Sequence, residues 1–163
     1  MYKEILWSRT MAESIFDLKC FSATETEAAG ARLADFMKQG NCPRFVALCG
    51  GLGAGKTAFT RGFCSVMCPG ATVRSPSFAI VNEYRGDPDV YHFDVWRIKD
   101  DDDLYSTGFY DYADRKGIVV CEWADSIAYA LPESYIKVKF DGNGDDPRHI
   151  VAELIKGDEV IVC

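Results

Sequence analysis

Seven segments of the chain have the hydrophobic pattern of β-strands. Nearly unbroken apolar runs, as at 44–50 and 117–123, are typical of strands buried on both faces of a parallel sheet. Segments in which apolar and polar residues alternate are typical of strands with one exposed face. The predicted strands are residues 14–22, 44–50, 79–85, 89–98, 117–123, 135–140 and 149–155.

Two segments have helical periodicity instead, residues 22–40 and 56–67. In the first, Ser22 and Glu25 have the spacing of a capping box, and Gly40 ends the pattern. Its apolar stripe consists of Ala29, Leu33, Phe36 and Met37. The turn sequences GDPD and DGNGDDP predict two hairpins, one between the third and fourth strands and one between the last two.

A glycine-rich stretch, GGLGAGKT at 50–57, separates the second strand from the second helix. Gly50, Gly55, Lys56 and Thr57 match G-x-x-x-x-G-K-[ST], the phosphate-binding loop or Walker A motif. Glycines let successive N–H groups turn inward, and the following helix N-terminus adds positive potential, so the loop can bind a polyphosphate. Lys56 would reach the β- and γ-phosphates, and the Thr57 hydroxyl would bind Mg²⁺. The plain alternative is a glycine-rich turn followed by a surface lysine.

The order of the predicted strands and helices along the chain, together with this motif, predicts an α/β fold: a three-layer P-loop NTPase-like domain. Its mixed sheet would have a parallel core and antiparallel additions. The length of 163 residues predicts one domain, residues 1–163, to which residues 1–14 could be an N-terminal appendage.

Carboxylates at the ends of two predicted strands are candidate catalytic groups. Glu122 follows the apolar run GIVVC, and parallel strands end at the same edge of a sheet, so we expect Glu122 near the loop as a Mg²⁺ ligand. Asp94 lies on the same face of its strand as His92, in apolar surroundings that favour a cation or metal-bound water as partner. An ordinary strand-end contact for Glu122, and an ion pair of Asp94 with Arg97, remain the alternatives.

Ser75 and Ser77 flank a proline in VRSPSFAIV, between the second helix and third strand. Their hydroxyls could reach a γ-phosphate or its metal, as in nucleotide-sensing switch loops. Ser-Pro-Ser is also common in plain turns.

Charge and cysteine content limit the kinds of protein that this sequence can encode. The net charge of −7 argues against a dominant electrostatic grip on nucleic acid. The seven cysteines match no zinc or redox spacing, which indicates reduced thiols in a cytoplasmic protein. The sequence shows neither a membrane span nor a signal peptide. The acidic run KDDDD at 99–103 is typical of a solvated helix start, or of a docking patch for a basic partner.

Five motifs, in order and spacing, resemble the bacterial TsaE (YjeE) family: GGLGAGKT, VRSPSFAIVNEY, YHFDVWRI, GFYDY, and GIVVCEWAD followed by LP. The resemblance covers about residues 21–155 and departs from the family pattern at Gly51, where an acidic residue is usual, and at Ser77, where threonine is usual. It implies an ATPase required for threonylcarbamoyladenosine modification of tRNA next to the anticodon. The implied partners are TsaD-like and TsaB-like proteins, and ATP hydrolysis would drive or reset their complex. Contact with tRNA would be indirect, through that complex, and no membrane would be contacted.

The resemblance also implies residue roles, with ATP and Mg²⁺ as cofactors. Lys56, Asp94 and Glu122 would be catalytic, while Thr57 and Glu122 would bind the metal. Trp123 matches a family tryptophan, and Arg148 a family arginine of unassigned role. The nucleotide-binding residues would be Gly51, Leu52, Gly53, Ala54, Gly55, Lys56, Thr57, Ala58, Ser75 and Ser77.

Two other functions fit the same loop. A small-molecule kinase would need an acceptor pocket and an arginine-rich lid, and the arginines here are scattered. A nucleotide-gated binding module would bind ATP without turnover.

Overall fold

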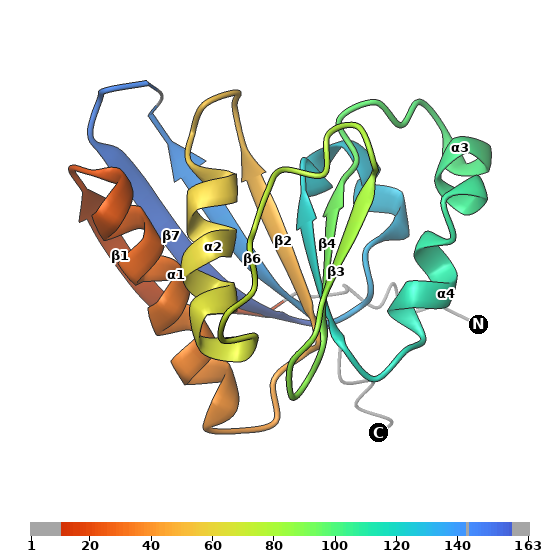
Figure 1. Ribbon diagram of the computed structural model, residues 1–163, viewed down its shortest axis with the longest axis horizontal. Helices are drawn as coiled ribbons and strands as arrows, with labels where there is room; N and C mark the ends of the chain where they lie inside the picture. The colour runs from red at the N-terminus through yellow and green to blue at the C-terminus, as the bar shows by residue number, and fades with distance from the viewer. Residues whose placement is uncertain (1–10, 143, 158–163) are drawn as a thin grey trace, which may run out of the picture.

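Seven strands form one mixed sheet in the computed structural model, which describes residues 11–142 and 144–157 (Figure 1). The spatial order is β1-β7-β6-β2-β5-β4-β3. Strand β2 runs parallel to β5 and β6, and β4 runs parallel to β5. Antiparallel pairs add β1 to β7, β7 to β6, and β3 to β4. The predicted parallel core with antiparallel additions is confirmed, with strands β1 (Met11–Cys20), β2 (Phe45–Gly50), β3 (Val81–Tyr84), β4 (Val90–Asp94), β5 (Ile118–Glu122), β6 (Tyr135–Asp141) and β7 (Arg148–Lys156).

Helices cover both faces of the sheet, which confirms the three predicted layers (Figure 1). Side chains alternate across a strand, so Val46 and Leu48 of β2 pack beneath α1 and α2, whereas Phe45 and Ala47 face the other layer. That second layer contains α3, α4 and the 3₁₀ helix η1. The helices are α1 (Ala23–Lys38), α2 (Lys56–Met67), α3 (Asp101–Ser106), α4 (Phe109–Ala113) and η1 (Ala124–Ala130).

Helix starts follow the predicted capping chemistry. Ser22 is the N-cap of α1, and its hydroxyl accepts a hydrogen bond from the Glu25 N–H at 3.1 Å. The Glu25 carboxylate accepts from the N–H of Phe21, one residue before the cap. The run KDDDD starts α3, where Asp100 caps the helix by accepting from the Asp103 N–H at 2.9 Å.

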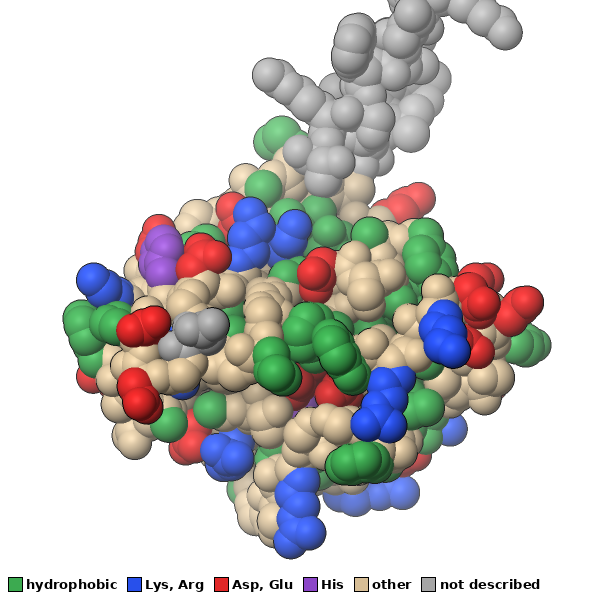
Figure 2. All heavy atoms as spheres, turned by 90° about the horizontal axis from the view of Figure 1, so that it is seen from above, with side chains coloured by type: hydrophobic (Ala, Val, Ile, Leu, Met, Phe, Trp, Pro, Cys, Tyr) green, Lys and Arg blue, Asp and Glu red, His purple; other side chains and the backbone are tan. Residues whose placement is uncertain are grey.

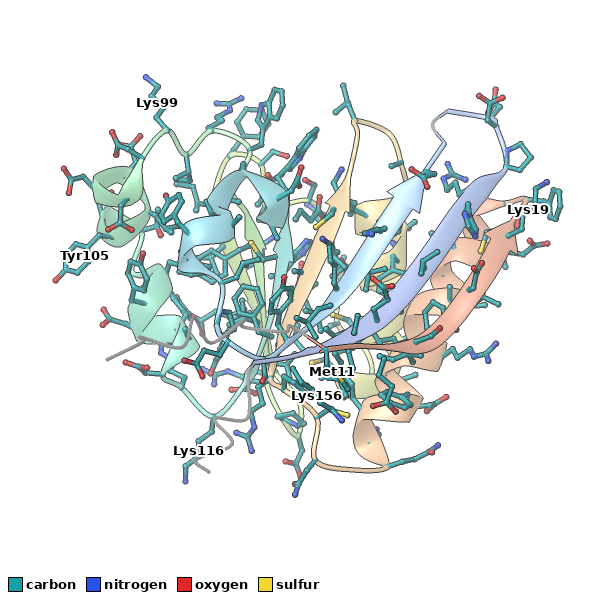
Figure 3. All side chains as sticks on the ribbon, turned by 180° about the vertical axis from the view of Figure 1, so that it is seen from behind. Met11, Lys19, Lys99, Tyr105, Lys116 and Lys156 are labelled. Carbon is teal, nitrogen blue, oxygen red and sulfur yellow. The ribbon has the colours of Figure 1, made fainter. Side chains whose placement is uncertain are left out.

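Some predicted boundaries were wrong. Strand β1 starts at Met11 and ends at Cys20, because Ser22 caps the following helix. Met11 pairs with Lys156 of β7, and Figure 3 shows the two ends together. Strand β4 stops at Asp94, so Trp96 does not belong to it as predicted. Residues 1–10 of the suggested appendage lie outside the described residues.

Six of the seven cysteines are described, and all six have free thiols. Cys163 lies outside the described residues. Desolvation by burial raises the pKa of the Cys121 thiol well above its ordinary value, which keeps this thiol protonated at neutral pH. Among the described residues, no helix is both long enough and apolar enough to cross a membrane.

Candidate nucleotide-binding site

The glycine-rich loop joins the carboxyl end of β2 to the first turn of α2, at the edge of the sheet seen from above in Figure 2. Gly53 and Gly55 have backbone φ values of 72° and 101°, which residues other than glycine rarely adopt. Gly55 is the N-cap of α2, and no side chain caps this helix. The first N–H groups of α2 are therefore left for a ligand, where the helix dipole favours an anion.

Lys56 is 6% exposed and folds back over its own loop. Its Nζ donates to the carbonyl oxygens of Gly50 and Gly51, both at 2.7 Å, and lies 4.0 Å from the centroid of the Trp123 ring. Desolvation lowers the pKa of Lys56, while the charges of Glu122, Asp125 and Asp94 oppose that shift. The site therefore holds a cation in a partly dehydrated environment, which strengthens its attraction for a phosphate.

Thr57 and Glu122, the predicted metal ligands, are in direct contact. The Thr57 hydroxyl donates to Glu122 Oε1 at 3.0 Å, and Glu122 is 4% exposed at the end of β5. His92 Nε2 lies 2.7 Å from the same oxygen. No group of three or more His, Cys, Asp or Glu side chains forms a complete metal cage within residues 11–142 and 144–157. A hydroxyl beside a carboxylate instead fits Mg²⁺, which keeps waters and takes its other ligands from phosphates.

Asp94 ends β4 directly opposite Glu122 in the parallel register and is 6% exposed. Its Oδ2 accepts from the Ser77 hydroxyl at 3.0 Å, and its Oδ1 accepts from the Trp96 N–H at 3.0 Å. Ser77 is in turn 2.7 Å from the Ser75 hydroxyl. The alternative ion pair of Asp94 with Arg97 does not form in the described structure; Arg97 lies over the Phe78 ring instead. Asp94 therefore ties the Ser75–Ser77 loop to the sheet edge.

These side chains border one cavity of about 480 Å³, a size typical of small-ligand sites. Residues 52–58, Ser75, Ser77, Asp94 and Glu122 all line it, as the sequence predicts for a shared site. Gly51, also predicted as a binding residue, does not line the cavity. Trp123, noted from the family pattern, lines it as well.

Three further residues line the cavity that the sequence did not indicate: Phe78, Trp96 and Arg97. Phe78 is 88% exposed and Trp96 is 57% exposed, with the Trp96 ring 4.7 Å from that of Trp123. Figure 2 shows exposed hydrophobic side chains beside acidic and basic ones on this edge. All three lie inside the motifs VRSPSFAIVNEY and YHFDVWRI, but no spacing rule distinguishes them there as binding residues.

Arg148 lies against the phosphate-binding loop although it comes from β7. A Cβ atom added at Gly55 would be 2.9 Å from its Nε, so a side chain at this position would force Arg148 to move. Arg148 Nη2 donates to the Gly144 carbonyl at 3.0 Å, whereas the buried Nε has no hydrogen-bond partner in the described part of the chain.

Comparisons with known proteins identify a family and a fold to which the chain is similar. The model of the family "Threonylcarbamoyl adenosine biosynthesis protein TsaE" matches residues 20–150. A tRNA threonylcarbamoyladenosine biosynthesis protein TsaE from Bacillus subtilis is 34% identical over 140 residues, covering 85% of each chain. Its namesake from Haemophilus influenzae is 37% identical over 119 residues, covering 71% of this chain and 75% of the relative. The crystal structure of Bacillus subtilis YdiB superposes with a TM-score of 0.70 at 28% identity, covering 90% of this chain and 87% of that one.

Proposed function

The chain belongs to the TsaE family of tRNA threonylcarbamoyladenosine biosynthesis proteins, and we propose that it serves this modification by binding and hydrolysing ATP with Mg²⁺. The observation that carries the proposal is the convergence of Lys56, Thr57, Glu122 and Asp94 on one cavity at the mouth of the loop. These are the groups that phosphate transfer from ATP requires: a cation, main-chain donors, a metal-binding pair and a further carboxylate.

In this proposal each residue has one task. The amides of residues 53–57 and the Lys56 ammonium hold the phosphate chain. To reach it, Lys56 gives up its hydrogen bonds to the Gly50 and Gly51 carbonyls. Thr57 and Glu122 hold Mg²⁺, which when bound neutralises phosphate charge. Asp94 orients a water or the metal hydration shell. Ser77 is hydrogen-bonded to Asp94, so the conformation of its loop depends on whether the site is occupied.

The described arginines support an ATPase over a small-molecule kinase. Arg61, Arg85 and Arg115 form ion pairs with Glu27, Asp89 and Glu83, respectively. Of the scattered arginines noted in the sequence, Arg97 is the one that lines the cavity. The described residues therefore do not assemble the arginine-rich lid that a kinase acceptor site would need.

We further propose that TsaD-like and TsaB-like proteins are the partners and that tRNA is reached only through them. Retention of these two chains from a lysate by the immobilised protein, with ATP present and less without it, is the expected result. Equal retention with and without ATP would contradict nucleotide control of the assembly.

Substitution of the two carboxylates separates binding from turnover. We expect Glu122→Gln and Asp94→Asn to bind ATP in EDTA as the wild type does, because neither is a phosphate ligand. Phosphate release should fall by about 100-fold, since each removes a charge that acts at the reacting centre. Steady-state phosphate release, with partners added if the isolated chain is slow, measures the effect.

Matched controls are Glu133→Gln and Asp111→Asn, both exposed and remote from the cavity, which should hydrolyse ATP as the wild type does. Normal hydrolysis by Glu122→Gln or Asp94→Asn would contradict the assigned site. ATP binding without hydrolysis by the wild type, even with partners, would favour a nucleotide-gated module.

A further inference from the structure

A buried row of hydrogen-bonding groups extends from the proposed metal site to the loop that contains Ser75 and Ser77. It starts at Glu122, whose Oε1 lies 2.7 Å from His92 Nε2. His92 Nδ1 lies 3.5 Å from the Tyr84 hydroxyl. That hydroxyl is 3.2 Å from the carbonyl oxygen of Arg74, the residue before Ser75. The row crosses three neighbouring strands, β5, β4 and β3.

His92 is fully buried in β4. A buried imidazole is costly unless its nitrogens find partners, and the partner of Nε2 is the carboxylate of Glu122. Alternation along β4 places His92 on the same face as Asp94, two residues later. His92 therefore contacts Glu122, which lines the cavity, without lining the cavity itself.

Both contacts of the Glu122 carboxylate fall on one oxygen. Oε1 accepts from the Thr57 hydroxyl and faces His92 Nε2, while Oε2 has no protein partner among the described residues. Two contacts on one oxygen fix the plane of the carboxylate and leave the other oxygen for a cation. Groups that hold a metal ligand in this way tune metal affinity without touching the metal.

Tyr84 connects this arrangement to the loop. Its hydroxyl donates to the Arg74 carbonyl and accepts from the Arg74 N–H at 3.3 Å, so it holds both polar groups of one peptide residue. Asn82 Nδ2 also donates to the Arg74 carbonyl, at 3.1 Å. Tyr84 is 7% exposed, and its two contacts with Arg74 are partly buried.

We infer that His92 and Tyr84 are positioning residues: His92 orients Glu122 for Mg²⁺, and Tyr84 sets the start of the Ser75–Ser77 loop relative to that carboxylate. This inference rests on the proposed function, because it assigns residues to the same ATP site. Neither residue touches the nucleotide; each acts through Glu122 or through Arg74.

The test compares ATP binding with and without metal. His92→Leu keeps the volume and removes both nitrogens. We expect its ATP Kd in EDTA to stay within about twofold of wild type, and the gain in affinity on adding Mg²⁺ to fall by about 10-fold or more. His92→Gln, whose amide can still donate to Glu122, should recover most of that gain, whereas His92→Asn, with a shorter side chain, should not. Isothermal titration calorimetry measures both constants.

Tyr84→Phe removes only the hydroxyl and tests the connection to the loop. We expect its Mg²⁺-dependent gain in ATP affinity to match wild type, because His92 and Glu122 remain. Its kcat should fall by about 10-fold with KM little changed, because the loop is misplaced only for turnover. His149→Gln on β7 and Tyr129→Phe on η1, both outside the cavity, are the matched controls and should behave as wild type.

A wild-type Mg²⁺ response in His92→Leu would overturn the role of His92, as would an equal loss of affinity with and without metal, which is the signature of a merely structural residue. Unchanged kcat in Tyr84→Phe would overturn the link to the loop. If His92→Leu does not fold, the contrast between His92→Gln and His92→Asn decides, and equal behaviour of the two refutes the inference. A wild-type protein that binds no ATP would instead refute the proposed function itself.

Discussion

At the scale of single residues, the site combines groups that are costly to bury. Lys56, Asp94 and Glu122 are each less than 7% exposed, and all three border the same cavity. Such a cluster is stable only where opposite charges and hydrogen bonds compensate the lost hydration. Here Thr57, His92 and main-chain carbonyls provide that compensation around an opening the size of a small ligand.

The lowered pKa of Lys56 predicts a pH-dependent stability difference. Its folded-state pKa lies below the ordinary value of 10.5, so the unfolded chain binds more protons between these two pKa values. Stability therefore rises with pH across that interval. At neutral pH, where Lys56 is charged in both states, Lys56→Met should be as stable as the wild type or more stable.

That advantage should shrink as the pH approaches 10.5, and thermal unfolding at a series of pH values measures it. Lys116→Met, an exposed lysine at the opposite end of the molecule (Figure 3), corrects for general effects of losing a lysine. An advantage that grows with pH would show that burial of the charge is not the dominant cost.

At the scale of elements, the strand–loop–helix unit β2–α2 determines the geometry of the site. Its loop depends on main-chain conformations that only glycine adopts freely, and on the close approach of Arg148. An element built in this way is sensitive to one added methyl group.

Gly55→Ala should therefore destabilise the protein by about 1–2 kcal/mol and weaken ATP binding, because φ is 101° and the new Cβ would meet Arg148 Nε at 2.9 Å. Denaturant unfolding and ATP titration measure the two effects. Gly40→Ala is the control: nothing lies within 4 Å of its added Cβ, so stability should change by less than about 1 kcal/mol. Equal effects of the two substitutions would contradict a special role for Gly55.

The two long helices could be predicted from their periodic pattern, whereas the short helices α4 and η1 could not. Helix α2 occupies the predicted residues 56–67, because its apolar spacing spans three turns. Helix α4 has five residues after Gly108, and η1 follows Trp123, whose φ of 61° is rare outside glycine. Neither contains enough turns for a periodicity to emerge.

The site was predictable to the extent that it lies in contiguous motifs. The glycine-rich loop and the strand-end carboxylates can each be recognised from the residues next to them in the sequence. The contact of His92 with Glu122, in contrast, joins residues 30 positions apart. Arg148 meets Gly55 only because β7 is folded next to β6 in the sheet. Such contacts depend on strand order, which local patterns do not encode.

At the scale of the whole molecule, the first and last strands of the described residues are neighbours in one sheet: β1 pairs with β7, and both lie on the side of the sheet away from β3. This order places β2, the strand that precedes the glycine-rich loop, at the centre of the sheet, between β6 and β5. The proposed nucleotide site thus lies at the middle of the sheet edge, at the carboxyl end of a central parallel strand.

The net charge of −7 predicts weak binding of tRNA by this chain alone. In a gel-shift titration, the isolated protein should show no salt-sensitive complex at micromolar concentrations, and partners should supply the RNA contacts. A tight complex that weakens steeply with added salt would contradict indirect recognition.

The central claim, that the loop and Lys56 hold the phosphates of ATP, is tested most directly by titrating ATP with Mg²⁺ into the wild type and Lys56→Ala by calorimetry. We predict one site per chain in the wild type, an affinity about 100-fold or more lower in Lys56→Ala, and wild-type binding in Lys116→Ala. An absence of binding to the wild type, or equal binding to Lys56→Ala, would contradict the account.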